Sequence, residues 1–186
     1  MSEERAGELV LEVFATEELT AAQRAAVVEL CIAAHEEEAF RELFTTFIPS
    51  GGRHVLGHQG TELVTHAVVT TRWAQPAGLP ELRTGYVDAV STRPDCQGLG
   101  YGSATLRRLA AESGDYEVGC LQTDREGFYE RLGWECWRGP LAGRGEHGLI
   151  PTPDQRGVMV LRLPRTPALD LDALLTIECQ PARIWE

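Results

Sequence analysis

A strand, a glycine-rich loop and a helix in succession, over residues 85–110, constrain this 186-residue chain more than any other stretch. Residues 86–92 are dominated by β-branched and aromatic side chains, which predicts a strand that Pro94 closes. Three glycines fall within residues 97–102, and apolar residues follow them at spacings of three and four. Glycines let backbone N–H groups approach a phosphate closely, and a helix N-terminus adds a partial positive charge. The stretch therefore predicts a site for an anionic ligand.

Two nucleotide-binding patterns can be compared with this loop. A dinucleotide fingerprint needs G-x-G-x-x-G, but Ser103 stands at the third glycine and no long series of alternating strands and helices follows. The pattern Q-x-x-G-x-G is met in full by Gln97, Gly100 and Gly102. That pattern is the pyrophosphate loop of the GNAT acyltransferases, which this stretch resembles. A plain turn is the remaining alternative, although it needs fewer glycines, and each extra one costs roughly 1 kcal/mol in a helix relative to alanine.

Length and composition fit one globular domain over residues 1–186. No apolar run approaches the ~20 residues of a membrane span. The acidic N-terminus lacks a signal-peptide pattern, so we expect a cytoplasmic protein with no membrane partner. The net charge of −11 argues against nucleic acid as a partner and is compatible with a cationic substrate. Neither the five cysteines nor the five histidines show metal-ligand spacing, so we expect free thiols and no metal site.

The rest of the chain alternates short strand-like and helix-like segments. We expect strands over residues 9–14, 54–57, 63–73, 86–92, 116–121, 134–137 and 158–163, and helices over 19–34, 40–47 and 125–132 as well as after the glycine loop. Residues 138–157 are rich in glycine and proline and predict a loop on the substrate side, and residues 166–186 form a weakly patterned tail. The order predicts an α+β fold, and the GNAT resemblance implies a central mixed, mostly antiparallel sheet flanked by helices.

A second motif makes the resemblance more specific. Gly127-Phe-Tyr-Glu-Arg-Leu-Gly-Trp134 resembles the F-Y-x-x-x-G-[FW] element that follows the coenzyme loop in the GNAT superfamily. Gly85-Tyr-Val-Asp-Ala-Val90, the run at 132–140, Thr152-Pro-Asp154 and the near-terminal Trp185 together resemble the aminoglycoside 2'-N-acetyltransferases, and among these the kasugamycin-acetylating members. The match is recognisable from about residue 54 to the C-terminus.

The resemblance implies acetyl-CoA as the acetyl donor, and it assigns the following cofactor-binding residues: Val90, Thr92, Gln97, Gly98, Leu99, Gly100, Tyr101, Gly102 and Ser103. It implies Asp88 as the base that accepts the proton of the substrate amine. The family has Glu at this position, and Asp is one methylene shorter, so a water relay becomes more necessary. Tyr129 matches the tyrosine that protonates the leaving thiolate.

On the substrate side the resemblance implies contacts from Glu37, Glu38, Asp88, Gln122, Asp154, Gln155, Arg183 and Trp185. For Glu37 and Glu38 a solvated helix end is an equal alternative. The family has an acidic residue where this chain has Arg183, and an Asp where it has Gln155, and its Ser-rich segment is shortened here to residues 122–124. A site that loses carboxylates and gains an Arg favours a substrate with its own carboxylate, which kasugamycin has.

Three functions stay open at this point. The first is acetylation of an aminoglycoside in a direct ternary complex, which would confer antibiotic resistance. The second is acetylation of another small amine or a peptide, and the third is a non-catalytic acyl-CoA sensor. The presence of both Asp88 and Tyr129 favours an enzyme, because a sensor needs neither. A homodimer is a possible assembly, since we expect Trp73 to be exposed.

Overall fold

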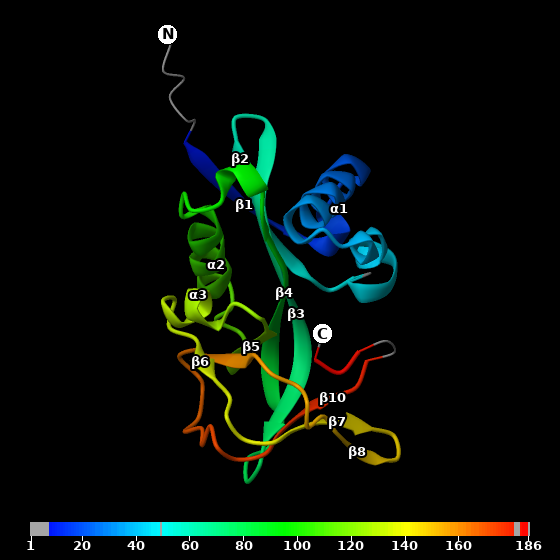
Figure 1. Cartoon of the computed structure of the whole chain (residues 1–186), viewed down its shortest axis with the longest axis vertical. Helices are drawn as coiled ribbons and strands as arrows, with labels where there is room; N and C mark the ends of the chain where they lie inside the picture. Colours follow the sequence, from blue (N-terminus) through cyan, green and yellow to red (C-terminus); the bar gives the residue numbers. More distant parts are fainter. Residues whose placement is uncertain (1–7, 49, 181–182, 186) are drawn as a thin grey trace. The chain divides into compact units, whose positions relative to one another are not determined.

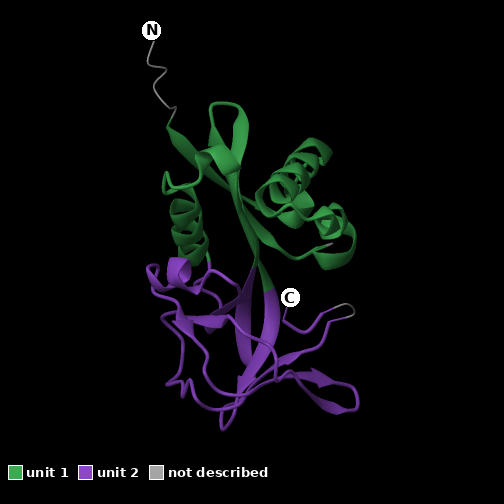
Figure 2. Cartoon of the chain, viewed as in Figure 1, with its two compact units in different colours: residues 1–70, 88–112 green, residues 71–87, 113–186 purple. Residues whose placement is uncertain are grey.

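Strands β3 (Glu62–Pro76) and β4 (Leu82–Thr92) each contribute residues to two units of the chain. The structure is a computed structural model that describes residues 8–48, 50–180 and 183–185. Unit 1 comprises Met1–Thr70 and Asp88–Glu112, and unit 2 comprises Thr71–Val87 and Ser113–Glu186 (Figure 2). No helix among the described residues is both long and apolar enough to span a membrane.

Unit 1 has strands at its centre and a helix on each of their two faces (Figure 1). Strand β1 (Leu9–Ala15) pairs antiparallel with β2 (Arg53–Gln59), which pairs antiparallel with β3. The helical elements are η1 (Thr16–Glu18), α1 (Ala21–His35), η2 (Glu38–Glu42), η3 (Leu43–Phe47), η4 (Pro94–Cys96) and α2 (Tyr101–Ala111). Side chains alternate across a strand, so β3 presents Val68 to the core that includes Val27 of α1, and presents Thr65 to Thr105 of α2.

Helix α1 begins and ends where its sequence provides caps. The Thr20 hydroxyl accepts a hydrogen bond from the Gln23 N–H at 3.2 Å, and the Gln23 side chain accepts one from the Thr20 N–H at 2.9 Å, which is a capping box. At the other end Glu36 adopts a left-handed conformation with φ 59°, and its N–H donates to the Ile32 carbonyl. These caps place His35 in the last turn of the helix.

Unit 2 is a sheet whose strand order is β6-β9-β5-β4-β3-β10-β7-β8. The strands not yet named are β5 (Val118–Gln122), β6 (Glu135–Cys136), β7 (Leu141–Gly145), β8 (Gly148–Pro151), β9 (Val158–Arg162) and β10 (Leu175–Glu178), and one short helix, α3 (Glu126–Glu130), follows β5. The β4–β5 and β10–β7 pairs are parallel, whereas the β10–β3, β5–β9, β6–β9 and β7–β8 pairs are antiparallel. Its core includes Tyr86, Trp137, Ile177 and Trp185. The predicted α+β fold with a mixed, mostly antiparallel sheet is confirmed.

Two segments differ from the sequence prediction. Residues 138–157 are not a loop throughout, because they contain the hairpin β7–β8. The tail contains strand β10, in which Leu175 and Ile177 are buried. These strands are five, four and four residues long, too short for alternation to show, and their partners in the sheet stabilise them. Residues 181, 182 and 186 of the predicted tail lie outside the described residues.

Smaller differences concern the start of one strand and the type of one helix. Strand β4 begins at Leu82, four residues before the predicted start, and the helix predicted over residues 40–47 is a 3₁₀ turn followed by a π turn.

Trp73 is exposed as predicted, with 43% of its surface accessible. The five cysteines are free thiols. Among the described residues, no cluster of three or more His, Cys, Asp or Glu side chains could hold a metal ion.

Candidate active site

The glycine loop of unit 1 has a backbone that only glycine adopts without strain. Gly98 has φ 80°, and Gly100 has φ 83° and caps α2 at its N-terminus. A Cβ atom added to either residue would meet nothing within 4 Å, so the loop leaves open space beside its backbone. Helix α2 has its first backbone hydrogen bond from Ala104 to Gly100, and the amides of residues 101–103 therefore precede that ladder. This geometry fits the diphosphate of acetyl-CoA.

Side-chain hydrogen bonds hold the loop and α2 against the strands of unit 1. The Gln97 amide donates to the Thr92 carbonyl at the end of β4 at 3.2 Å. The Gln59 amide donates to the Tyr101 hydroxyl at 2.8 Å, and Thr65 and Thr105 share a hydrogen bond of 3.1 Å. These bonds hold the loop and α2 in place, and Leu99 in the loop is 58% exposed.

Strand β4 is irregular where the predicted catalytic residues lie. Ala89 has φ 48°, a left-handed conformation that costs a non-glycine residue roughly 1–2 kcal/mol. Asp88 and Val90 flank it, and all three residues are half-buried. This irregularity could not be predicted, because nothing in the Asp-Ala-Val run demands a positive φ.

Two buried histidines hold the irregular residue. The His66 ring nitrogen Nδ1 lies 2.9 Å from the Ala89 carbonyl, and its Nε2 lies 2.9 Å from Nδ1 of His54. Nε2 of His54 in turn lies 2.9 Å from the Thr16 hydroxyl. A carbonyl can only accept, so His66 Nδ1 carries a proton and, in the neutral ring, its Nε2 accepts from His54 Nδ1. His66 is therefore a hydrogen-bonded residue inside strand β3.

Both rings are neutral at physiological pH. Each has 0% of its surface exposed. Burial lowers the pKa of His66 to about 4, against a weaker raising effect of the hydrogen bond to Ala89. Burial, followed by the nearby His66 and Arg24, lowers the pKa of His54 to about 2. Protonating either ring would place an unpaired charge in the core of unit 1.

We expect the protein to lose stability as the pH falls below about 6.5. In the unfolded chain each imidazole binds a proton near pH 6.5, whereas the folded state binds none until about pH 4 for His66. The free energy of unfolding therefore falls by up to ~1.4 kcal/mol per pH unit for each ring. Urea unfolding at pH 7, 6 and 5 measures this slope. The double variant His54→Asn, His66→Asn should show a flatter slope, and an unchanged slope would exclude the histidines as its source.

Tyr129 lies in unit 2, in the short helix α3. Its side chain is 7% exposed and makes edge-on ring contacts with Phe128 and with Trp134, at centroid distances of 5.0 and 6.0 Å. The Tyr129 carbonyl accepts from the backbone N–H groups of Leu132 and Trp134. The F-Y-x-x-x-G-W motif is thus one compact turn that holds the tyrosine ring in place.

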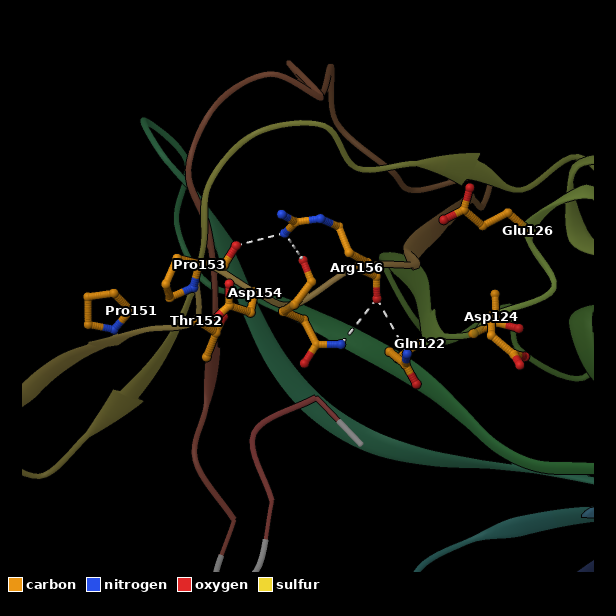
Figure 3. A pocket seen from close by; sticks show the side chains of 10 residues that line it. Gln122, Asp124, Glu126, Pro151, Thr152, Pro153, Asp154 and Arg156 are labelled. Carbon is orange, nitrogen blue, oxygen red and sulfur yellow. Dashed lines mark hydrogen bonds between the residues drawn. The ribbon is translucent and has the colours of Figure 1, made fainter. Parts of the chain in front are cut away.

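A cavity of about 610 Å³ lies at the end of β5 in unit 2 (Figure 3). It is lined by Gln122, Thr123, Asp124, Glu126, Pro151, Thr152, Pro153, Asp154, Gln155 and Arg156. The Arg156 guanidinium donates to the Pro153 and Gln155 carbonyls at 2.7 and 2.8 Å, and the amides of Gln122 and Gln155 both donate to the Arg156 carbonyl. Three carboxylates against one guanidinium make the cavity acidic. The predicted residues Gln122, Asp154 and Gln155 are therefore neighbours.

Trp185 contacts the lining of this cavity through Thr152. Its side chain is 1% exposed, and the indole N–H donates to the Thr152 hydroxyl at 3.1 Å. The Tyr86 hydroxyl donates to the Trp185 carbonyl. Tyr86 itself packs under Arg72 and Arg183, whose guanidinium carbons lie 4.7 and 5.8 Å from its ring centre. Tyr86 thus joins Trp185 to the two arginines.

The arginines beside Tyr86 differ in their surroundings. Arg72 is fully buried, and burial lowers the pKa of its guanidinium even though the Glu178 carbonyl accepts from it at 2.6 Å. Burial likewise raises the pKa of the Glu178 carboxyl, against the opposing effect of Arg72. Arg183 is half-buried and donates to the Gln180 side chain at 3.1 Å.

The other predicted substrate residues, Glu37 and Glu38, lie after α1 in unit 1. Both are exposed, and Glu38 accepts from Arg41 at 2.6 Å. Their predicted role stays a prediction. The sequence did not identify His35 or His66 as site residues, because each contacts strand β4 from a position distant in the chain. Thr152 and Asp124 lie in segments that the resemblance included, but neither was assigned a role.

The fold and the glycine loop define an acyl-coenzyme A-dependent transferase. A family model described as "Acetyltransferase (GNAT) family" matches residues 16–134. The chain belongs to this family, and it is an acetyl-CoA-dependent N-acetyltransferase.

Individual proteins show the same relationship. An "Aminoglycoside 2'-N-acetyltransferase" of Mycolicibacterium fortuitum is 33% identical over 142 residues, which is 73% of this chain and 72% of that protein. The GNAT family N-acetyltransferase YhbS of Escherichia coli, solved in complex with CoA, superposes with a TM-score of 0.64 at 11% identity, over 100% of this chain and 99% of that one. A probable N-acyltransferase of Enterococcus faecalis gives a TM-score of 0.57 at 16% identity over 72% of this chain, which spans 33% of that chain's length. The two structures support the fold alone.

Proposed function

We propose that the chain transfers an acetyl group from acetyl-CoA to an amine of an aminoglycoside antibiotic, with kasugamycin favoured, and so confers resistance. The observation that carries the proposal is the 33% identity to the aminoglycoside 2'-N-acetyltransferase of M. fortuitum over 72% of that protein. The whole proposal treats residues 1–186 as one acetyltransferase domain, and the family match over residues 16–134 includes parts of both units.

The acidic cavity of unit 2 supports an acceptor that carries amines. Asp124, Glu126 and Asp154 present carboxylates there, while the Arg156 guanidinium is engaged by backbone carbonyls. Charge-assisted hydrogen bonds between carboxylates and ammonium groups are the strong polar contacts available to such a substrate. The cavity volume of about 610 Å³ lies within the range of small-molecule sites.

Arg183 is the feature that favours kasugamycin over polycationic aminoglycosides. It is half-buried, and its guanidinium lies over the Tyr86 ring, so part of its hydration is already lost. A planar guanidinium binds a carboxylate through two parallel hydrogen bonds, and it repels an additional ammonium group. A substrate with both an amine and a carboxyl group matches this combination of charges.

The chemistry divides among three groups of the chain. Asp88 takes a proton from the amine through water, because a protonated amine is not a nucleophile. The Val90 N–H donates to the thioester carbonyl as negative charge grows on its oxygen. Tyr129 gives a proton to the departing sulfur. Positioning of both reactants can supply ~7–11 kcal/mol, whereas a proton-transfer group adds roughly 10²–10⁴-fold, so most of the acceleration comes from binding geometry.

Removing the base should slow transfer without abolishing it. We expect Asp88→Ala to lower kcat roughly 10²-fold at pH 6.5, and less at higher pH, where more of the amine is already neutral. Rates between pH 6 and 9 measure this. Asp154→Asn is the matched control, because it removes a cavity carboxylate and should raise the acceptor KM while leaving the pH profile of kcat unchanged. Wild-type rates for Asp88→Ala at every pH would show that Asp88 is not the base.

The acceptor is tested by following thiol release from acetyl-CoA with kasugamycin, gentamicin, tobramycin or a peptide. We expect turnover with kasugamycin, and we expect Arg183→Ala to raise its KM about tenfold or more, the cost of a charged hydrogen bond. If gentamicin and tobramycin are turned over as fast as kasugamycin, the substrate is still an aminoglycoside, but Arg183 does not select for a carboxyl group. Turnover of the peptide alone would support the alternative of a different amine acceptor.

Further expectations concern the alternative function, the assembly, the location and the partners of the chain. Coenzyme binding without turnover of any amine would favour the alternative of an acyl-CoA sensor. A homodimer remains possible because Trp73 is exposed, and the cytoplasmic location remains an expectation. We propose no nucleic-acid partner for a chain with a net charge of −11.

A further inference from the structure

We propose that His66 and His35 are positioning residues for acetyl transfer, which fix the peptide groups on both sides of Val90 and thereby aim the Val90 N–H at the thioester carbonyl. The inference rests on the proposed function in one respect, since it adopts the Val90 N–H as the hydrogen-bond donor. It adds two residues, neither of which needs to touch the substrate.

His66 fixes the direction of the Val90 N–H through a single peptide plane. Its Nδ1–H donates to the Ala89 carbonyl at 2.9 Å. The Ala89 carbonyl and the Val90 N–H belong to the same planar trans peptide, so they point in opposite directions. Once the carbonyl is held towards His66, the N–H must point away from it. Rotation of this plane would change ψ of Ala89 and φ of Val90 together.

His35 fixes the next peptide plane. Its Nε2 lies 3.1 Å from the Val90 carbonyl and 3.0 Å from the Ser91 hydroxyl. The ring stacks on Phe40 at a centroid distance of 5.0 Å, and it stands in the last turn of α1. Val90 is therefore held on both sides, with one histidine on the carbonyl before its N–H and the other on its own carbonyl.

The His66 ring cannot turn without breaking a longer chain of hydrogen bonds. Its Nε2 accepts from His54 Nδ1, and His54 Nε2 contacts Thr16. Both rings are fully buried and neutral, so the donor and acceptor roles stay fixed over the pH range of an activity assay. A left-handed non-glycine residue in a strand is strained, and such strain persists only where surrounding contacts determine it. This hydrogen-bonded chain supplies those contacts.

The two histidines use different ring nitrogens, which gives a crossed test. The Asn side chain places an N–H near the position of His Nδ1, and the Gln side chain places one near His Nε2. His66→Asn and His35→Gln should therefore keep the donor, whereas His66→Gln and His35→Asn should lose it. We expect the first two variants to retain kcat within about threefold, and the last two to lose about 10–100-fold, less than the loss on removing an oxyanion donor outright.

The KM for acetyl-CoA should change little in all four variants, because the glycine loop is untouched. Val27→Ala serves as the control, since it opens a cavity in the core of unit 1 and removes no hydrogen bond to either histidine. It should lower stability and leave kcat unchanged. If Asn and Gln have equal effects at each position, or if Val27→Ala lowers kcat as much, the histidines act by packing alone and the proposal is overturned.

A measurement without any acceptor separates this inference from the proposed function. In a ¹⁵N–¹H NMR titration with acetyl-CoA, we expect the Val90 amide proton to shift downfield in the wild-type protein and in His66→Asn, but not in His66→Gln. This pattern would support the positioning role even if no aminoglycoside were acetylated. Saturating acetyl-CoA that leaves the Val90 amide unshifted in the wild type would overturn it. If His66→Gln does not fold, His35→Asn at an exposed position gives the same comparison.

Discussion

Gly157→Ala is expected to lower the free energy of unfolding by about 3–5 kcal/mol, the sum of backbone strain and a lost buried hydrogen bond. Gly157 has φ 69°, and a Cβ atom there would lie 1.7 Å from the Thr123 carbonyl oxygen. The obstacle is backbone and cannot move aside as a side chain can. The Gly157 carbonyl also accepts from the Thr123 N–H at 2.9 Å, so relief of the clash would break the contact that joins the two segments.

Gly78→Ala is the matched control for this variant. Gly78 also belongs to unit 2 and also has a positive φ, 81°, but a Cβ atom there would meet nothing within 4 Å. We expect it to cost about 1–2 kcal/mol, the price of a left-handed alanine alone. Urea unfolding of both variants gives the difference that belongs to the contact with Thr123. If both variants lose the same free energy of unfolding, the positive φ alone, and not the contact with Thr123, explains the need for glycine at position 157.

Gly157→Ala should weaken binding of the acceptor more than binding of the coenzyme. Thr123 and residues 151–156 line the cavity, and the backbone contact with Gly157 holds them together. The glycine loop belongs to unit 1 and is not part of this contact. We therefore expect a raised KM for kasugamycin and a nearly unchanged dissociation constant for CoA, measured by calorimetry below the unfolding temperature.

The glycine loop could be predicted from sequence because its requirements are local. A left-handed backbone and a helix N-terminus follow from the residues that form them, and the structure confirms both at Gly98, Gly100 and α2. Gly157 has an equally strict requirement, yet its reason is a carbonyl 34 residues away. The local pattern of residues 138–157 shows only that glycine and proline are frequent, so it predicted a loop where a hairpin stands.

The histidine contacts that hold the irregular part of β4 could not be predicted, for the same reason. The carbonyl of Ala89, the residue with positive φ, contacts His66, which lies 23 residues earlier, and His66 in turn contacts His54. His66 lies within the strand predicted over residues 63–73, but its hydrogen-bond partner could not be identified without the strand pairing. The cavity residues Gln122, Asp154 and Gln155 were predicted by family resemblance alone, since no spacing rule connects the end of β5 to a loop that long.

Trp185→Ala is expected to lower the free energy of unfolding by about 3–5 kcal/mol, as for other buried Trp side chains. The indole is 1% exposed and packs in the core of unit 2. The variant would also leave the Thr152 hydroxyl without its donor. Thermal or urea unfolding measures the loss, and a change below about 1 kcal/mol would contradict the burial of this side chain.

The family resemblance implies that Trp185 contacts the antibiotic, whereas its burial points to action through Thr152. Trp185→Phe keeps most of the ring and removes the N–H, and Thr152→Val keeps the shape and removes the hydroxyl. If Trp185 acts through the hydrogen bond, each variant should raise the KM for kasugamycin by a similar factor, and the double variant should be no worse than either, because one interaction is lost in all three. If the ring contacts the antibiotic directly, Trp185→Phe should retain the wild-type KM while Thr152→Val raises it. We expect the first outcome, which would make Trp185 a support for the cavity wall.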